Sequence, residues 1–377
     1  MSDQHERRVA AIIRGLGPRL DDLITPALVF DLDAVEHNVA AMRSFAGEGR
    51  WRPHVKTHKH PEVVRRLLDG GVRDFKCATL DELVMLLEVG AQVDVVLAYP
   101  VTGPMARAAA HIALQHPHST VRLLADSPEH LASLDHALRD APVRLSALLD
   151  VDVGMHRTGT APHRWGSPSA EHLDLVGLHG YEGHVRWPQA DVAKACYRAL
   201  LELASHVRFD VQWIVTSGTH AFHHALAHAA LTEGPWTHQV SPGTLVLSDL
   251  RSARAAELLQ LQQAAFVLSR VVSRTQPGRI TLDAGSKALN PDCPPPACAA
   301  VGYPDLVALA ASEEHRPCAV EGDAPRPGDL VALIPEHVCT TVNMYREVQL
   351  VRDGVDEGPT PIPASQRSHD LTVFVRR

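Results

Sequence analysis

Features that would mark a membrane-spanning, secreted or nucleic-acid-binding protein are missing from these 377 residues. No apolar run reaches the roughly 20 residues needed to span a bilayer. Residues 1–17 lack the apolar core and the small-residue cleavage site of a secretory signal. The net charge is −8, and no block of like charge is long enough for a nucleic-acid-binding arm. We therefore expect neither a membrane nor nucleic acid as a partner.

Cysteine is also too sparse to organise the fold. Six cysteines in a chain of this length do not form a dense disulfide framework, which favours a reducing compartment. Together with the missing signal, this predicts a cytoplasmic protein. Hydrophobic residues make up 45% of the chain, enough for a large buried core and more typical of two domains than of one.

Short apolar runs alternate with longer amphipathic stretches over the first two thirds of the chain. Nine runs of strand type are predicted: 27–32, 51–56, 74–79, 94–100, 121–126, 145–152, 175–182, 211–217 and 243–249. Helices are predicted at 79–90, 127–138 and 190–207. Such alternation implies a parallel sheet, and eight strands close a (β/α)8 barrel with one strand left over. The rival fold, an open doubly wound sheet, lacks its Gly-x-Gly-x-x-Gly turn here.

The pattern changes after residue 250. Residues 264–285 read as strands joined by a Pro-Gly turn, and residues 328–358 again alternate like a sheet. The predicted fold class is therefore α/β: a (β/α)8, TIM-like barrel followed by a C-terminal all-β domain.

Charged and aromatic residues follow the predicted strands at the ends where a barrel carries its active site. Lys56 ends one of these runs, and a lysine desolvated at a barrel mouth becomes a nucleophile that forms Schiff bases. A solvated loop lysine is the simpler alternative. Arg157 follows another run as a permanently charged donor for a ring oxygen or a carboxylate. Tyr181 and His184 stand at the end of the next.

Small residues at two further strand ends suit a phosphate group. Ser217, Gly218 and Thr219 open a predicted helix, where backbone N–H groups face an anion. Gly243 and Thr244 belong to a late strand, and late-strand loops of barrels often bind phosphate. Each signal alone also marks ordinary turns. A lysine, a ring-oxygen donor and a phosphate cradle on one rim together indicate pyridoxal phosphate.

The segment PEHVCTTVN, residues 335–343, indicates a metal site. On a strand, alternate residues share a face, so His337 and Cys339 are expected to project together. Imidazole plus thiolate favours zinc over magnesium or calcium. Two protein ligands leave room for water or substrate, as catalytic zinc requires. A buried cysteine beside a chance histidine is the alternative.

Taken together, these residues resemble the fold-type III pyridoxal-phosphate enzymes of the D-serine dehydratase and D-threonine aldolase family. The matching segments run in order along nearly the whole chain: 25–39, RPHVKTHK (52–59), DVGMHRTG (152–159), GLHGYEGH (177–184), 282–292, 312–315 and HVCTTVN (337–343). The resemblance implies an alanine racemase-like barrel over 33–249. It also implies that residues 1–32 and 250–377 form a β-domain that carries the metal, and that the protein is a homodimer.

The resemblance gives each candidate residue a role. Lys56 would be the Schiff-base lysine, Arg157 would contact the phenolic oxygen of the cofactor, and Tyr181 would lie near its pyridine ring. His337 and Cys339 would hold the metal. The phosphate would be held by Ser217, Gly218, Thr219, Gly243 and Thr244. The segment TSGTHAF departs from the family's Gly-Ser/Thr-rich pattern, which leaves the phosphate-binding atoms open.

The implied activity is that of a metal-dependent lyase acting on β-hydroxy D-amino acids. The His-x-Cys pair resembles the dehydratase branch, in which freed Lys56 removes the α-proton and the metal assists the departing hydroxide. The products are then a 2-oxo acid and ammonia, and we expect this dehydration, with D-serine among the candidate substrates.

Aldol cleavage to glycine and an aldehyde is the alternative. The segments TTVN and GYEGH resemble the aldolase branch, in which His58 or His184 would take the hydroxyl proton. An amino-acid racemase and a non-catalytic pyridoxal-phosphate carrier are further alternatives.

Overall fold

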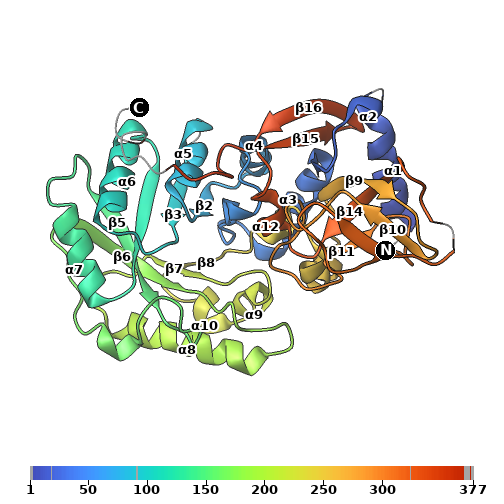
Figure 1. Ribbon diagram of the computed structural model, residues 1–377. Helices are drawn as coiled ribbons and strands as arrows, with labels where there is room; N and C mark the ends of the chain where they lie inside the picture. Colours follow the sequence, from blue (N-terminus) through green and yellow to red (C-terminus); the bar gives the residue numbers. More distant parts are fainter. Residues whose placement is uncertain (1–2, 18, 91, 323, 369–373, 375–377) are drawn as a thin grey trace. The chain divides into compact units, whose positions relative to one another are not determined.

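The structure is a computed structural model that describes residues 3–17, 19–90, 92–322, 324–368 and 374 (Figure 1). The chain divides into two compact units. Unit 1 comprises residues 1–41, 57–66 and 244–366, and unit 2 comprises residues 42–56, 67–243 and 367–377. Among the described residues, none of the helices combines the length and the apolar character that crossing a membrane demands.

Unit 2 is built around a parallel sheet whose seven strands follow one another in chain order. They are β2 (Asp74–Cys77), β3 (Asp94–Leu97), β4 (Thr120–Ala125), β5 (Leu145–Val151), β6 (Leu173–Gly180), β7 (Trp213–Thr216) and β8 (Thr237–Val240). Residues 51–54 fill an eighth place, because Trp51 bridges in parallel to Val240 and His54 to Lys76. The two edges of the sheet are thereby joined, and the predicted barrel is confirmed.

Helices connect the strands of the barrel and lie around the sheet (Figure 1). They are α5 (Leu80–Glu88), α6 (Gly103–Gln115), α7 (Pro128–Ala137), α8 (Ala190–His206), α9 (Phe222–Leu226) and α10 (Ala229–Thr232). Two of them begin where the sequence predicts. The Thr79 hydroxyl accepts the Glu82 N–H at the start of α5, and the Ser127 hydroxyl accepts the His130 N–H at the start of α7.

A buried arginine fills the end of the barrel where the strands begin. Arg52 has no solvent exposure, and its guanidinium donates to Gln239 Oε1 at 2.6 Å and to Asp94 Oδ1 at 2.8 Å. Asp74 Oδ1 accepts a third bond at 3.2 Å. Asp74 and Asp94 are the first residues of β2 and β3. Balanced charges at this end of a barrel, away from the active-site end, contribute to stability rather than to chemistry.

Unit 1 is built on a largely antiparallel sheet of nine strands. Its strands are β1 (Ala27–Asp31), β9 (Ala265–Ser273), β10 (Arg279–Leu282), β11 (Cys298–Ala300), β12 (Val307–Ala308), β13 (Arg316–Ala319), β14 (Leu330–Pro335), β15 (Glu347–Arg352) and β16 (Val355–Pro361). β1 pairs with β9 and, in parallel, with β15. The first strand of the chain thus belongs to this sheet, as the resemblance implied. The exact domain boundaries at 32/33 and 249/250 stay a prediction.

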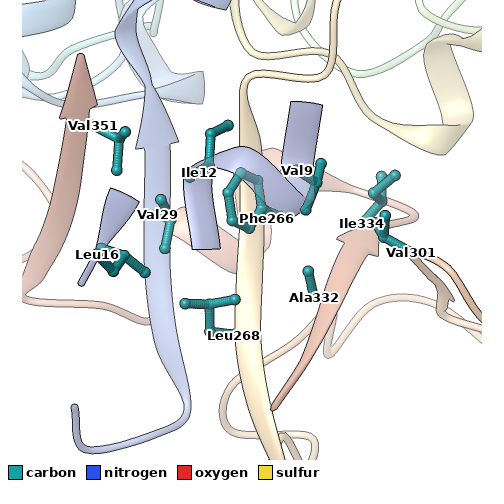
Figure 2. Packing of buried hydrophobic residues seen from close by; sticks show 10 residues of the cluster. All are labelled: Val9, Ile12, Leu16, Val29, Phe266, Leu268, Val301, Ala332, Ile334 and Val351. Carbon is teal, nitrogen blue, oxygen red and sulfur yellow. The ribbon is translucent and has the colours of Figure 1, made fainter. Parts of the chain in front are cut away.

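Helix α1 (Asp3–Gly15) covers one face of this sheet (Figure 2). Val9, Ile12 and Leu16 recur at helical spacing and pack against strand residues. The strand residues of the cluster are Val29, Phe266, Leu268, Ala332, Ile334 and Val351. A Cβ atom at Gly15 would overlap the carbonyl of Gly354, so only glycine allows this close approach.

The remaining helices are α2 (Arg19–Asp22), α11 (Ala253–Leu259) and α12 (Val338–Val342) in unit 1. Two further helices, α3 (Leu32–Ala46) and α4 (Pro61–Asp69), run across the division between the units.

Three predicted strands are wrong in detail. Residues 51–56 form isolated bridges and then a 3-10 turn at Val55–Thr57. Residues 243–249 contain a 3-10 turn at Thr244–Val246, and the true strand, β8, precedes them. Residues 335–343 were expected in a strand, but His337 is the N-cap of helix α12 and Cys339 lies in its first turn.

Candidate active site

Lys56 lies in the short 3-10 turn that follows the eighth place of the barrel. Its backbone N–H donates to His54 Nδ1 at 3.3 Å, and His54 is bridged to Lys76 at the end of β2. The Lys56 side chain is exposed, so the desolvated lysine expected from the sequence is not found. Its position at the C-terminal end of the strands agrees with the expectation.

The Tyr181 ring is held tightly at the same end of the barrel. A Cβ atom at Gly183 or at Gly218 would overlap atoms of the ring, so both loops approach it as only glycine permits. The Arg157 guanidinium carbon lies 4.7 Å from the ring centroid, a cation–π arrangement. The structure therefore brings Arg157, Tyr181 and Gly218 together as the sequence predicts. A small pocket beside them is lined by Asp150, Met155, Arg157, Thr158 and Tyr181, among others.

A buried glutamate that the sequence reasoning missed organises the loop after β7. The Glu182 carboxylate accepts the Ser217 N–H at 3.1 Å, the Ser217 hydroxyl, and the Tyr197 hydroxyl at 3.1 Å. Ser217 has a φ of 62°, a left-handed conformation that is unusual outside glycine. Burial raises the pKa of Glu182 against the opposing effect of these hydrogen bonds.

The five predicted phosphate ligands are not equivalent in the structure. Ser217 is fully buried with both donors engaged by Glu182, so it is not available to a phosphate. The backbone N–H groups of Gly218 and Thr219 make no hydrogen bond within the described chain, and both residues are half-buried. Gly243 belongs to unit 2, whereas Thr244 belongs to unit 1, where its hydroxyl lies 3.8 Å from the Cys339 thiol.

The two histidines proposed as bases occupy different units. His184, in unit 2, has Nε2 3.8 Å from the Cys196 thiol and a buried Nδ1 with no partner among the described residues. His58, in unit 1, is 1% exposed, and its Nδ1 accepts the His60 N–H. Burial, helped by the neighbouring His60, lowers the pKa of His58 to about 3. A ring with so low a pKa is a weak proton acceptor at neutral pH.

His337 and Cys339 lie together in unit 1, on a helix start rather than on a strand. Their side chains are hydrogen-bonded to each other, and the Asp292 carboxylate lies 2.7 Å from His337 Nδ1. Burial opposes the charged ring, but the neighbouring Cys339 and Asp292 outweigh it and raise the pKa of His337 to about 9. The Cys339 thiol also lies 3.3 Å from the Thr57 hydroxyl.

The Asp292 carboxylate is hydrogen-bonded to the His337 ring, and such a carboxylate partner is usual for metal-binding histidines. Within the part of the chain that the structure describes, no group of three or more His, Cys, Asp or Glu side chains is arranged to hold a metal ion.

A second group that the sequence reasoning missed lies inside the barrel. Lys76 Nζ donates to His179 Nε2 at 2.6 Å, and His179 Nδ1 donates to Asp150 Oδ1 at 2.6 Å. All three are buried, at 3% exposed or less. We call them the buried triad. Each lies inside a predicted strand, and a charged residue near the end of a barrel strand is the signal that would have found them.

Comparison with known proteins identifies the families that this architecture matches. Residues 30–251 match the alanine racemase N-terminal domain, and residues 264–351 match a serine dehydratase domain. A D-threonine aldolase from Arthrobacter sp is 30% identical over 375 residues, which cover 92% of this chain and 96% of that protein.

Two solved structures extend the comparison. The D-threonine aldolase from Filomicrobium marinum has a TM-score of 0.79 at 27% identity, covering 91% of this chain and 96% of that one. The D-threo-3-hydroxyaspartate dehydratase from Delftia sp. HT23 has a TM-score of 0.72 at 22% identity, covering 91% and 98%, and shows a likeness of fold alone.

Proposed function

Because this chain belongs to the fold-type III pyridoxal-phosphate enzymes that join an alanine racemase N-terminal domain to a serine dehydratase domain, we propose that it cleaves β-hydroxy D-amino acids into glycine and an aldehyde. The observation that carries the choice of reaction is the 30% identity to a D-threonine aldolase along nearly the full length of both chains. Dehydration, which the His-x-Cys pair favours from the sequence, has the weaker support, since the similar dehydratase shares only the fold.

The residues of unit 2 fit pyridoxal phosphate. The adjacent N–H groups of Gly218 and Thr219 have no partner within the described chain, follow a barrel strand, and suit a phosphate. Arg157 lies against the Tyr181 face and suits an anionic ring oxygen. Lys56 is an exposed amine at the same end of the barrel and suits covalent attachment. When bound, this cofactor withdraws electrons from the substrate carbon next to the amine.

The residues of unit 1 fit a divalent metal with an incomplete protein ligand set. The His337 ring and the Cys339 thiol are hydrogen-bonded, and Asp292 holds Nδ1 of the ring. An imidazole and a thiol are borderline-to-soft donors that favour zinc, which in catalytic sites leaves positions for water or substrate. A metal held there would act as a Lewis acid toward a hydroxyl oxygen. We propose a homodimer on the resemblance alone, and a cytoplasmic location on the sparse cysteine content.

Product analysis tests the reaction. The purified protein is loaded with pyridoxal phosphate and zinc and given D-serine, D-threonine and D-threo-3-hydroxyaspartate separately. Glycine with the matching aldehyde is the expected result. A 2-oxo acid with ammonia would overturn the proposal in favour of dehydration.

Two further outcomes separate the remaining alternatives. Interconversion of D- and L-amino acids that survives thorough metal removal by EDTA would indicate a racemase. A bound yellow chromophore without turnover of any of the three substrates would indicate a carrier.

A further inference from the structure

Lys76 stands out because the chain has few lysines and buries this one. Only five lysines are present, at positions 56, 59, 76, 194 and 287. Lys76 is 3% exposed, and lysine is almost never buried unless its charge is compensated. The triad that holds it plays no part in the function proposed so far.

The buried triad spans the interior of the barrel. β2 and β6 are four places apart in an eight-place ring, so the hydrogen bond from Lys76 to His179 crosses the lumen. Lys76, Asp150 and His179 are each the penultimate residue of their strand. They form one polar layer at the C-terminal ends of the strands, where barrels carry their active sites. Arg52 and its hydrogen-bond partners Gln239, Asp74 and Asp94 fill the opposite end of the barrel.

The layer borders the proposed cofactor site. Asp150 lines the same small pocket as Arg157 and Tyr181. Lys76 is paired in register with His54, two residues before Lys56. The triad is therefore placed to respond to a charged ligand bound beside Arg157.

The hydrogen bonds define where the protons reside. A carboxylate only accepts, so His179 Nδ1 carries the proton given to Asp150. Burial, and then the neighbouring Lys76, lowers the pKa of His179, so the ring is neutral and Nε2 accepts from Lys76. If Lys76 loses one proton, its remaining N–H donors still reach Nε2. The amine can change charge without breaking the network.

The charged groups around Lys76 have opposing effects on its pKa. Burial is the main cause that lowers the pKa of Lys76 to about 7, and the charged neighbours contribute to that value in both directions. Asp150 and Glu182 favour its ammonium form, whereas Lys56 and Arg157 disfavour it. Asp150 Oδ2 is buried and has no partner among the described residues, so its charge is directed mainly at the triad.

We propose that Lys76, held by His179 and Asp150, takes up a proton from water when the anionic cofactor binds beside Arg157, so that cofactor affinity depends on pH through this one amine. The inference rests on the proposed function, because it assumes a phosphorylated pyridine ligand at this site. Lys76 acts here through charge, not through a bond to the ligand. An anion prefers the ammonium form, so affinity falls as pH rises through neutrality.

The first test measures Lys76 in the cofactor-free protein. With lysine labelled at Cε with carbon-13, five signals are expected, and the one missing in Lys76→Met belongs to Lys76. It should titrate near pH 7, while Glu313 and Glu314 raise the pKa of the exposed Lys287 above the ordinary lysine value. Asp150→Asn removes a favourable charge and should move the Lys76 titration to lower pH. A Lys76 signal that titrates above pH 9 would overturn the proposal.

The second test measures binding of pyridoxine 5′-phosphate, which lacks the aldehyde and forms no bond with Lys56. Between pH 7 and 9 the affinity of the natural chain should fall by up to tenfold per pH unit, the limit for one coupled proton. Lys76→Arg should bind tightly with little pH dependence, and Lys76→Met weakly with little pH dependence. Lys194→Met, on an exposed face of α8, is the matched control and should behave like the natural chain.

The outcomes separate this proposal from the proposed function. An unchanged pH dependence in Lys76→Met would refute the role of Lys76 and leave the lyase reaction standing. If Lys76→Met does not fold, Asp150→Asn and the titration of the natural chain still decide the question. Failure to bind pyridoxine 5′-phosphate at any pH would instead remove the proposed cofactor itself.

Discussion

Glu182 and Ser217 are joined by two hydrogen bonds that tie the loop after β6 to the loop after β7. The carboxylate accepts both the backbone N–H and the hydroxyl of Ser217, which is held in a left-handed conformation. The next two residues, Gly218 and Thr219, carry the N–H groups proposed to bind phosphate. Glu182 therefore positions the loop that is proposed to bind phosphate.

Replacing this carboxylate should weaken cofactor binding. Glu182→Ala leaves the buried Ser217 N–H without its acceptor, at a cost of about 1–3 kcal/mol, while the Ser217 hydroxyl can still donate to Thr216 Oγ1. We expect at least a tenfold loss of pyridoxal-phosphate affinity and a lower free energy of unfolding. Glu182→Gln keeps an acceptor and should lose less of both.

Titration of the cofactor-free protein with pyridoxal phosphate, alongside urea denaturation, measures both effects. Glu202→Gln, at an exposed position of α8, is the control. Wild-type affinity in Glu182→Ala would show that the loop needs no such support.

Lys56 rather than Lys59 should attach the cofactor covalently. Lys56 is exposed at the barrel end, whereas Lys59 is 7% exposed and belongs to unit 1. Lys56→Ala should abolish the near-visible absorbance of bound pyridoxal phosphate and all turnover. Borohydride reduction and peptide mapping of the natural chain should find the label on Lys56. Loss of the absorbance in Lys59→Ala alone would show that the assignment within KTHK is wrong.

The metal content should depend on three residues of unit 1. His337→Ala and Cys339→Ser each remove a proposed ligand and should leave little metal after dialysis against a chelator. Asp292→Ala removes the carboxylate behind the ring and should weaken metal binding about 10- to 100-fold. Mass spectrometry of bound metal per chain gives the readout.

A nearby thiol supplies the control for the metal experiment. Cys293 lies 3.1 Å from Arg251, which in turn lies 3.3 Å from Asp292, but we do not place it among the ligands. Cys293→Ser should retain the metal. If Cys339→Ser retains it as well, the proposed pair is not the metal site.

Acid should destabilise unit 2 through His238. The His238 side chain is buried, Nε2 lies 2.9 Å from the Thr216 hydroxyl, and burial lowers its pKa to about 3. The unfolded chain binds a proton near pH 6.5 while the folded chain does not. The stability from this group is present above pH 6.5 and is lost as the pH falls toward 3, by up to about 1.4 kcal/mol per pH unit.

Urea denaturation between pH 4 and 7 measures this slope. His238→Gln cannot take up the proton and should show a slope smaller by that amount, whatever its absolute stability. Equal slopes in the two proteins would contradict the assignment.

The alternation of apolar runs was sufficient to predict the barrel, because strands buried on both faces read as continuous apolar segments. The prediction of strands from apolar runs failed where buried residues do not form a strand and where a strand is polar. Leu245 and Val246 are fully buried, yet they lie in a 3-10 turn, while the polar sequence THQV forms β8. Local composition does not distinguish these cases, since the pairing of β8 with β7 decides them.

Residues of the candidate site could be predicted where they follow a strand. They were missed where they lie inside a strand. Arg157, Tyr181 and Gly218 come together as expected. Lys76 and His179 were overlooked because each stands within an apolar run, and their contact joins residues 103 apart in sequence. His337 and Cys339 do come together, but at a helix start rather than on the expected strand, and their role as metal ligands stays a prediction.

The choice between the two lyase reactions was not legible in the sequence. The His-x-Cys pair resembles the dehydratase branch, whereas GYEGH resembles the aldolase branch. Full-length similarity to an aldolase now favours the reaction that the sequence reasoning ranked second.

The division of the chain constrains how such a protein can be rearranged. The backbone changes unit after residues 41, 56, 66, 243 and 366, and the consecutive residues Lys56 and Thr57 fall on opposite sides of one such boundary. Neither unit is a contiguous stretch of sequence. A gene truncated at residue 243 would therefore retain β1 but lack β9 and β15, the two strands that pair with it. Neither unit can therefore be moved into another protein as one uninterrupted segment of this chain.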